Sequence, residues 1–441
     1  MSTSPLDNPL RNQVMDSCRE FLRQALSLSK EHFGSYTVPI RDVQVEVMEP
    51  TEPGHWLGAR FMHQDVDTRR IYDFEMTQLK TTTAWARAKE YIQIYVDKNK
   101  IHPIGFQLQD IETLYLLPLF RSYLEKVRRF AYRKREVDRI IRELINHLDM
   151  PAPEIKGIII LEDFSAARSF RLGPKMTIRP ISRHELIQLG RSDSLIGSRL
   201  GGGALIPRTD WWICEVVIPN PRGTAIGFNS IHDVEDLLSL SLRAFKPGGL
   251  RIGLAISQVV GPFGRTGQMR GGRLDQITVG GSRYSLSSTE ITAFTRFWRK
   301  FTSIMKQDKH YLQVPIRRLH AAGTRAQCED ALVDYVVGIE ALLGTKEEQT
   351  ELGYRFRVRG AVLLAKKRSK RKNYLGVLRE LYNLRSRIVH GQSVSIDKLN
   401  KALPKAESAL RTVWRWYFDR YANRKDNSAG IAEIDKKLVG G

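Results

Sequence analysis

The sequence predicts an α+β protein in which a mixed helix-and-strand region, residues 1–285, precedes an all-helical bundle, residues 286–441. Short runs rich in β-branched or aromatic residues and bounded by turn residues predict strands, and all of them lie in the first region. After residue 286, apolar residues recur at three- and four-residue spacing, which is typical of helices that bury one face.

The elements expected in the first region alternate between the two types. Residues 110–148 are helical in pattern and basic on one side, which a solvated helix face explains better than an RNA track. A division into two subdomains near residue 107 is also expected. In chain order the expected elements are a helix over 12–33, a strand at Val43–Met48, a helix at Thr83–Asp97, helix over 110–148, strands at Lys156–Leu161 and Trp211–Ile218, a helix at Val234–Phe245 and a strand at Leu250–Val260.

The second region begins with a helix-start signal. Ser287 and Glu290 have the spacing of a capping box, so a helix is expected over Ile291–Met305. A closing helix is expected over Ala406–Arg420. Aromatic residues at helical spacing in these two segments are more often core than base-stacking platforms; they include Phe294, Phe297, Trp298, Phe301, Trp414 and Tyr417.

Positive charge is concentrated in the second region. The chain has 70 Lys and Arg against 48 Asp and Glu, a net charge of +22. Residues 286–441 hold 31 basic and 16 acidic residues, so +15 of this charge lies in the last third. Such a concentration favours a polyanionic partner.

The cysteines and the chain start indicate the compartment. Cys18, Cys214 and Cys328 are far apart and lack metal-ligand spacing, which fits a reducing environment. The first residues lack a signal-peptide pattern, and no apolar run is long enough to span a membrane. We therefore expect a cytoplasmic protein with no membrane partner, no metal site and no cofactor.

One motif points to chemistry. The segment from Tyr382 to Gly391 places Arg385 and His390 five residues apart near the end of an expected helix, which Gly391 is suited to terminate. A guanidinium can hold a phosphate, and an imidazole can move protons near neutral pH. The spacing alone is not specific, because Arg142 to His147 and Arg179 to His184 repeat it.

The segments upstream of the third copy add context. An apolar helix containing Glu340, an arginine-rich segment with Arg355, Arg357 and Arg359, and the basic run 366–372 lead into the motif. This series resembles the HEPN domains, specifically the Apea-like group, over residues 286–437. The resemblance implies a helical, dimeric bundle that acts as a metal-independent endoribonuclease in anti-phage defence or as a toxin. Ser386 departs from the Asn, Asp or His that many HEPN nucleases carry there.

RNA cleavage without a metal proceeds by attack of the 2′-hydroxyl on the adjacent phosphorus. His390 suits the acid or base role, and Arg385 suits stabilisation of the developing charge. On an ideal helix the two side chains diverge by about 140°, so a second copy across a two-fold axis would complete the site. Ser386 could hydrogen-bond the His390 ring. In a purely structural alternative, Arg385 could form an ion pair with Glu340 or Glu380, and His390 could simply end the helix.

Two functions are therefore compatible with these residues. The first is an endoribonuclease acting on single-stranded or tRNA-like RNA, with Arg385 and His390 catalytic. The alternative is a catalytically silent HEPN homodimer that binds RNA, a nucleotide or a partner protein. Residues 1–285 would then sense a phage-derived or nucleotide trigger. The expected supporting residues are Ser386, Arg387, Asn383, Tyr382 and Glu340, and the expected RNA-binding residues are Lys366, Lys367, Arg368, Lys370, Arg371, Lys372, Arg355 and Arg359.

Overall fold

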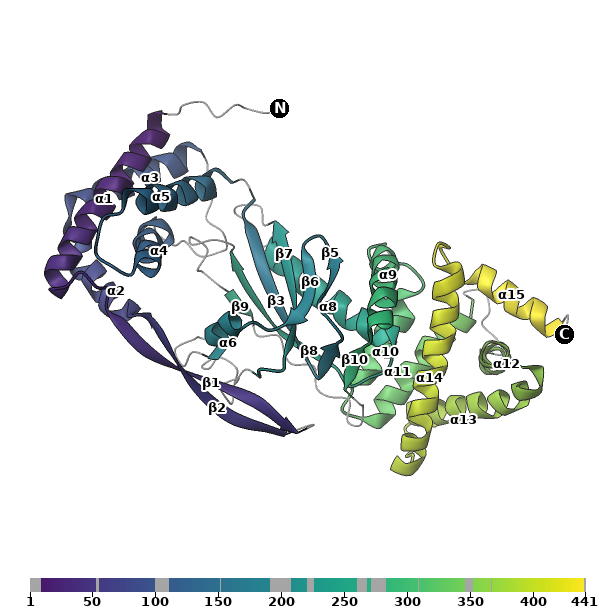
Figure 1. Ribbon diagram of the computed structural model, residues 1–441. Helices are drawn as coiled ribbons and strands as arrows, with labels where there is room; N and C mark the ends of the chain where they lie inside the picture. The colour runs from purple at the N-terminus through teal and green to yellow at the C-terminus, as the bar shows by residue number, and fades with distance from the viewer. Residues whose placement is uncertain are drawn as a thin grey trace. The chain divides into compact units, whose positions relative to one another are not determined.

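A computed structural model describes the chain in two compact units. The described residues are 9–52, 55–99, 111–150, 152–190, 208–219, 226–259, 268–270, 283–307, 309–345, 352–365 and 367–439. Unit 1 comprises Met1–Ile160, Gly173–Asp233 and Leu254–Gly272, and unit 2 comprises Leu161–Leu172, Val234–Gly253 and Arg273–Gly441. Strands in the first part of the chain and helices in the last part confirm the predicted α+β class (Figure 1). The subdomain split expected near residue 107 lies outside the described residues.

The helices of unit 1 share one apolar core. Phe21, Trp85 and Phe120 meet at its centre, with Phe21 edge-on to both other rings. The helices expected over 12–33 and Thr83–Asp97 are confirmed as α1 and α3. The helical elements are α1 (Pro9–Phe33), α2 (Thr68–Thr77), the short 3-10 turn η1 (Leu79–Thr81), α3 (Thr83–Lys98), the π-helical turn η2 (Glu112–Leu116), α4 (Leu117–Val127) and α5 (Lys134–Asp149).

The helix expected over 110–148 is interrupted. α4 ends at Arg128, which has a left-handed backbone with φ of 52°, and α5 begins at Lys134. The buried Tyr123 hydroxyl stabilises this break, because it accepts a hydrogen bond from the Arg133 N–H at 2.9 Å and donates one to the Ala131 carbonyl. Arg128, Arg129 and Arg133 therefore lie in a connection and do not share a helix face with Arg139.

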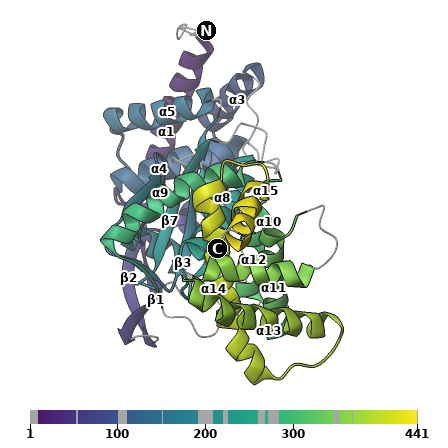
Figure 2. The same ribbon diagram turned by 90° about the vertical axis from the view of Figure 1, so that its right-hand side faces the viewer.

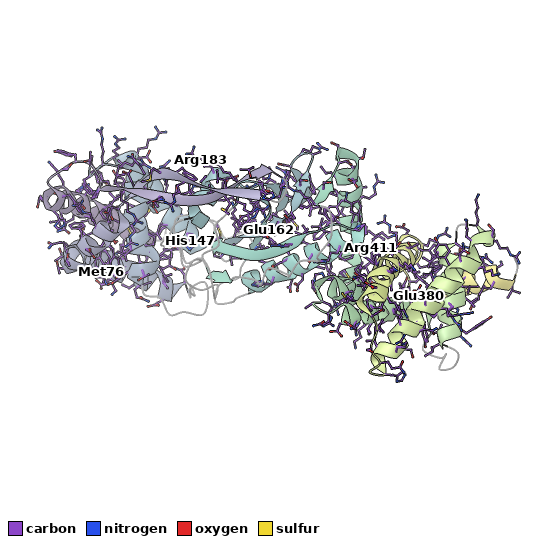
Figure 3. All side chains as sticks on the ribbon, turned by 90° about the horizontal axis from the view of Figure 1, so that it is seen from below. Met76, His147, Glu162, Arg183, Glu380 and Arg411 are labelled. Atoms are coloured by element: carbon purple, nitrogen blue, oxygen red, sulfur yellow. The ribbon has the colours of Figure 1, made fainter. Side chains whose placement is uncertain are left out.

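A long antiparallel hairpin follows α1. β1 (Ile40–Glu52) contains the expected strand Val43–Met48 and pairs with β2 (His55–Val66) in a register that sets Val45 opposite Phe61. Val45 and Val47 bury one hairpin face against Ile187 of α6 (Arg183–Gly190). Arg183 lies 5.3 Å from the Phe61 ring centroid, beside the hairpin in Figure 3.

Another sheet has six strands in the order β5-β6-β7-β3-β8-β9. β6 pairs antiparallel with β7, with Ile178 opposite Cys214. The three strands expected from the sequence are confirmed as β3, β7 and β8, whereas the remaining strands are too short to show a clear alternation. The bounds are β3 (Glu154–Glu162), β5 (Phe170–Gly173), β6 (Met176–Pro180), β7 (Trp212–Pro219), β8 (Arg251–Val259) and β9 (Gln268–Arg270).

Unit 2 is built mainly from helices. The capping box is confirmed, because the Ser287 hydroxyl accepts from the Glu290 N–H while the Glu290 carboxylate accepts from the Ser287 N–H. The expected core aromatics are buried. The elements are β4 (Phe164–Ala166) parallel to β10 (Tyr284–Leu286), α8 (Ile226–Phe245), α9 (Ser288–Met305), α10 (Gln313–Thr324), α11 (Cys328–Leu343), α12 (Leu352–Leu364), η3 (Arg368–Lys370), α13 (Arg371–Val389), α14 (Ile396–Tyr421) and α15 (Ser428–Val439).

Two features of unit 2 differ from the expectation. The helix expected to close the chain is α14, which begins before Pro404 and runs through it, and α15 follows it. Residues before 286 also contribute to the helical unit. The Tyr284 hydroxyl donates to the Leu242 carbonyl at 2.8 Å, and the rings of Phe245 and Phe294 lie 5.2 Å apart. The second half of α8 therefore packs on α9.

Two glycines of unit 2 should respond in opposite ways to an added methyl group. A Cβ at Gly430 would lie 2.2 Å from Cε1 of the buried Tyr417, whereas one at Gly376 on α13 would meet nothing within 4 Å. We expect Gly430→Ala to destabilise the fold by about 1–3 kcal/mol through overpacking. Gly376→Ala should stabilise it by about 0.5–1 kcal/mol. Thermal unfolding of both variants measures this, and equal midpoints would contradict the close packing of α15 on α14.

Candidate functional site

The motif helix ends as its sequence predicts. Leu378, Leu381 and Leu384 of α13 are buried, and the helix stops at Val389. Gly391 has φ of +74°. Its N–H donates to the Ile388 carbonyl at 3.0 Å, and the Gln392 N–H donates to the Arg387 carbonyl at 2.9 Å. This pair of bonds is the Schellman ending, and it places His390 at the C-cap.

Arg385 faces α11. Its Nη2 lies 3.8 Å from Oε2 of Glu340, which makes an ion pair that is too long for a hydrogen bond. Its Nε is buried without a hydrogen-bond partner among the described residues. Burial raises the pKa of the Glu340 carboxyl, and the nearby Arg385 charge opposes that rise. Glu340 thus holds the guanidinium by charge, and Arg385 donates no side-chain hydrogen bond within the described residues.

His390 is the C-cap residue of α13. Its side chain is exposed, and its imidazole has no hydrogen bond within the described part of the chain. The ring bond expected from Ser386 is not formed; the Ser386 carbonyl instead accepts from the His390 backbone N–H at 3.0 Å. Within one chain, Arg385 is paired with Glu340, whereas His390 is exposed. Glu380, labelled in Figure 3, pairs with Lys405 at 3.3 Å and not with Arg385.

The expected supporting residues have mixed surroundings. The Tyr382 ring lies 5.5 Å from that of Phe356, so it joins α13 to α12. Arg387 donates to the Ser393 carbonyl at 2.8 Å, which braces the loop after the motif. Asn383 is exposed. Helices α11, α12 and α13 lie side by side in unit 2 (Figure 2).

The expected RNA-binding residues separate into two groups. Lys367, Arg368, Lys370 and Lys372 are exposed on and around η3, while Arg371 donates to the Lys437 carbonyl at 3.4 Å. Arg355 is half-buried, and Lys366 lies outside the described residues.

Arg359 differs from the rest of this group because it is buried. Two of its nitrogens donate to the carboxylate of Asp435 on α15, at 2.9 and 2.8 Å, and a third donates to the Leu343 carbonyl at the end of α11, at 2.8 Å. These bonds join α11, α12 and α15. Arg359 therefore stabilises the packing of these helices and is not one of the proposed phosphate contacts.

The motif lies in the most basic part of the chain. Residues 352–390 contain 12 Lys and Arg and a single acid, Glu380, which gives +11, half of the net charge of +22. Most of these side chains are exposed or half-buried, since Arg359 alone among those described is buried. The segment that forms α12 and α13 therefore carries a high net positive charge.

The other two copies of the arginine–histidine spacing lie in different settings. His147 is buried on α5, with its ring 6.3 Å from that of Tyr115. Arg179 lies on β6 and His184 on α6, and Arg179 is held by Glu185 at 2.6 Å and Glu215 at 2.5 Å. These carboxylates also contact Lys156, and hydrogen bonds from Arg179 hold the pKa of Glu185 well below its usual range. Only the third copy combines an exposed histidine with a loosely held arginine.

Comparisons with known protein families, with curated proteins and with solved structures found no match for this chain. The likeness to HEPN domains thus rests on the residues of α11, α12 and α13 alone. Within the described ranges, no helix is both long and apolar enough to cross a membrane.

The Arg359 contacts predict a structural role that a mutation can separate from RNA binding. Asp435→Ala should destabilise unit 2 by about 1.5–3 kcal/mol, because it removes charge-assisted hydrogen bonds from a buried guanidinium. The exposed neighbour Lys436 provides a control, since Lys436→Ala should change stability by less than about 0.5 kcal/mol. Chemical unfolding measures both. A stable Asp435→Ala protein would contradict the role of Arg359 as a clamp.

Proposed function

We propose that this protein is a HEPN-type endoribonuclease that cleaves RNA by attack of the 2′-hydroxyl, leaving a 2′,3′-cyclic phosphate and a 5′-hydroxyl. The observation that carries the proposal is the last turn and a half of α13. It offers an arginine with unused donors and an exposed histidine within a segment of charge +11.

These residues match the demands of the reaction. An RNA phosphate drawn to the basic surface would accept hydrogen bonds from Arg385, whose charge stabilises the pentacoordinate phosphorus as negative charge builds on its oxygens. His390 would take the 2′-hydroxyl proton or give a proton to the leaving 5′-oxygen, a contribution of about 10²–10⁴-fold. The chemistry needs one cation and two proton-transfer groups, which two copies of these residues supply.

We propose a homodimer because an ideal helix sets the two side chains about 140° apart. Arg385 faces Glu340, whereas His390 is exposed. A second copy related by a two-fold axis would bring its His390 opposite Arg385 in a shared cleft. Val389 and Ile396, which are 53% and 56% exposed on either side of the loop after His390, offer apolar surface for this contact.

The remaining part of the proposal concerns regulation. An unrestrained ribonuclease would damage the RNA of its own cell, so we propose that residues 1–285 restrain cleavage until a phage-derived molecule or a nucleotide is sensed. This places the protein in anti-phage defence or in a toxin-like role.

Single substitutions test the chemistry. The full chain incubated with single-stranded RNA and EDTA should produce fragments with cyclic-phosphate ends. His390→Ala and Arg385→Ala should lower the rate by about 10²–10⁴-fold, and His390→Ala should leave RNA affinity unchanged. His184→Ala is the matched control, since His184 is an exposed histidine of another copy of the spacing.

The outcomes separate the two functions. Cleavage that requires added Mg²⁺, or that survives His390→Ala, would overturn the mechanism. RNA binding with no cleavage by the natural chain would favour the catalytically silent dimer.

The exposed lysines of the basic run should bind the RNA backbone. Replacing Lys367, Lys370 and Lys372 with Gln should weaken binding to all single-stranded RNAs without changing the cleavage products. The slope of log affinity against log salt should fall by roughly 0.7 for each lost phosphate contact. The control replaces three exposed lysines elsewhere, Lys98, Lys134 and Lys306. Equal salt slopes for the two triple variants would show that the basic run makes no phosphate contacts with RNA.

A further inference from the structure

Tyr354 is an exposed aromatic side chain in the basic part of unit 2. It is 58% exposed on α12, whereas Phe356, two residues later on the same helix, is 2% exposed. An aromatic ring left in water forgoes the free energy that burial of its apolar surface would provide. Its ring is therefore accessible to a ligand.

Two glycines place Tyr354 beside the motif. Gly353, its neighbour, lies so close to Tyr382 that an added Cβ would be 2.9 Å from the Tyr382 ring. A Cβ at Gly360 would lie 2.7 Å from Leu378. From Gly353 to Gly360 along α12, the nearest residue of α13 therefore changes from Tyr382 to Leu378, which lies closer to the start of α13. The two helices are antiparallel, and the first turn of α12, which carries Tyr354, lies at the motif end of α13.

The surroundings of Tyr354 contain charges of both signs, because Glu347, Glu348 and Glu351 precede α12 in the sequence. Arg355 and Arg357 flank Phe356 in the same turn, and the only acid in residues 352–390 is Glu380, which is paired with Lys405. An exposed ring beside arginines is a combination that proteins use for unpaired nucleic acid, in which phosphates contact cations and base faces stack on aromatic rings. A duplex hides its base faces, so this surface favours single-stranded RNA.

We propose that Tyr354 is a base-stacking residue that binds an unpaired nucleotide next to the phosphate held by Arg385. The inference rests on the proposed function, and it assigns the substrate class as single-stranded RNA with a base free to stack. Because every base has a π-face, Tyr354 confers a preference for unpaired regions and little sequence preference. Tyr354 is a binding residue and takes no part in proton transfer.

The test measures binding without cleavage, in full-length protein carrying His390→Ala. Fluorescence anisotropy with a short single-stranded RNA should show that Tyr354→Ala weakens binding by roughly 5- to 150-fold, the loss of one stacked base. Tyr354→Phe keeps the ring and should bind within about twofold of the parent. Tyr354→Leu keeps apolar volume without a π-face and should behave like Tyr354→Ala. Tyr36→Ala is the control, since Tyr36 is 56% exposed in unit 1.

A second readout reports stacking directly. RNA that contains 2-aminopurine loses fluorescence when the base stacks, so the parent should quench this probe and Tyr354→Ala should not. Unchanged affinity and quenching in Tyr354→Ala would overturn the inference. So would conversion of a dimer to a monomer by Tyr354→Ala, which would make Tyr354 a subunit contact. If the natural chain fails to cut RNA, the proposed function falls, while the binding data still decide the role of Tyr354.

Discussion

The buried guanidinium of Arg359 is the interaction on which the helical unit depends. A buried cation is stable only when acceptors surround it. Arg359 donates hydrogen bonds to the last carbonyl of α11 and to the carboxylate of Asp435 on α15. These bonds fix α12 between its neighbours. α12 then packs against α13 at Gly353 and Gly360, where the side chains of Tyr382 and Leu378 lie against glycines that have no side chain of their own. The position of the motif helix follows from this arrangement.

Much of the helical framework could be predicted from the sequence, because caps and apolar spacing are local signals. Ser287 and Glu290 start α9, and Gly391 ends α13, as expected. Tertiary structure overrode the local signal elsewhere. α14 runs through Pro404, and Tyr123 stabilises a break in a segment with continuous helical pattern. β2 was missed because it lies on a two-stranded hairpin and exposes Leu57 and Met62, which blurs the alternation.

The candidate site shows the same division. The sequence was sufficient to place Arg385 and His390 on the last turns of one helix, and Arg385 does pair with Glu340, as the alternative allowed. It was not sufficient to separate the three arginines of α12. Arg355, Arg357 and Arg359 are spaced by two residues, so successive side chains differ by about 200° around the helix. Only the packing of α11 and α15 shows that Arg359 is the buried one.

The glycine that ends α13 has a consequence for how the site can change over generations. Gly391 adopts a left-handed backbone that residues with a Cβ rarely adopt, and the two bonds that close the helix depend on it. The backbone conformation at the His390 C-cap therefore depends on Gly391, a residue with no side chain. Mutation of Gly391 to a residue with a Cβ would therefore strain the helix end and shift the backbone at His390, while Arg385 and His390 both stay in the sequence.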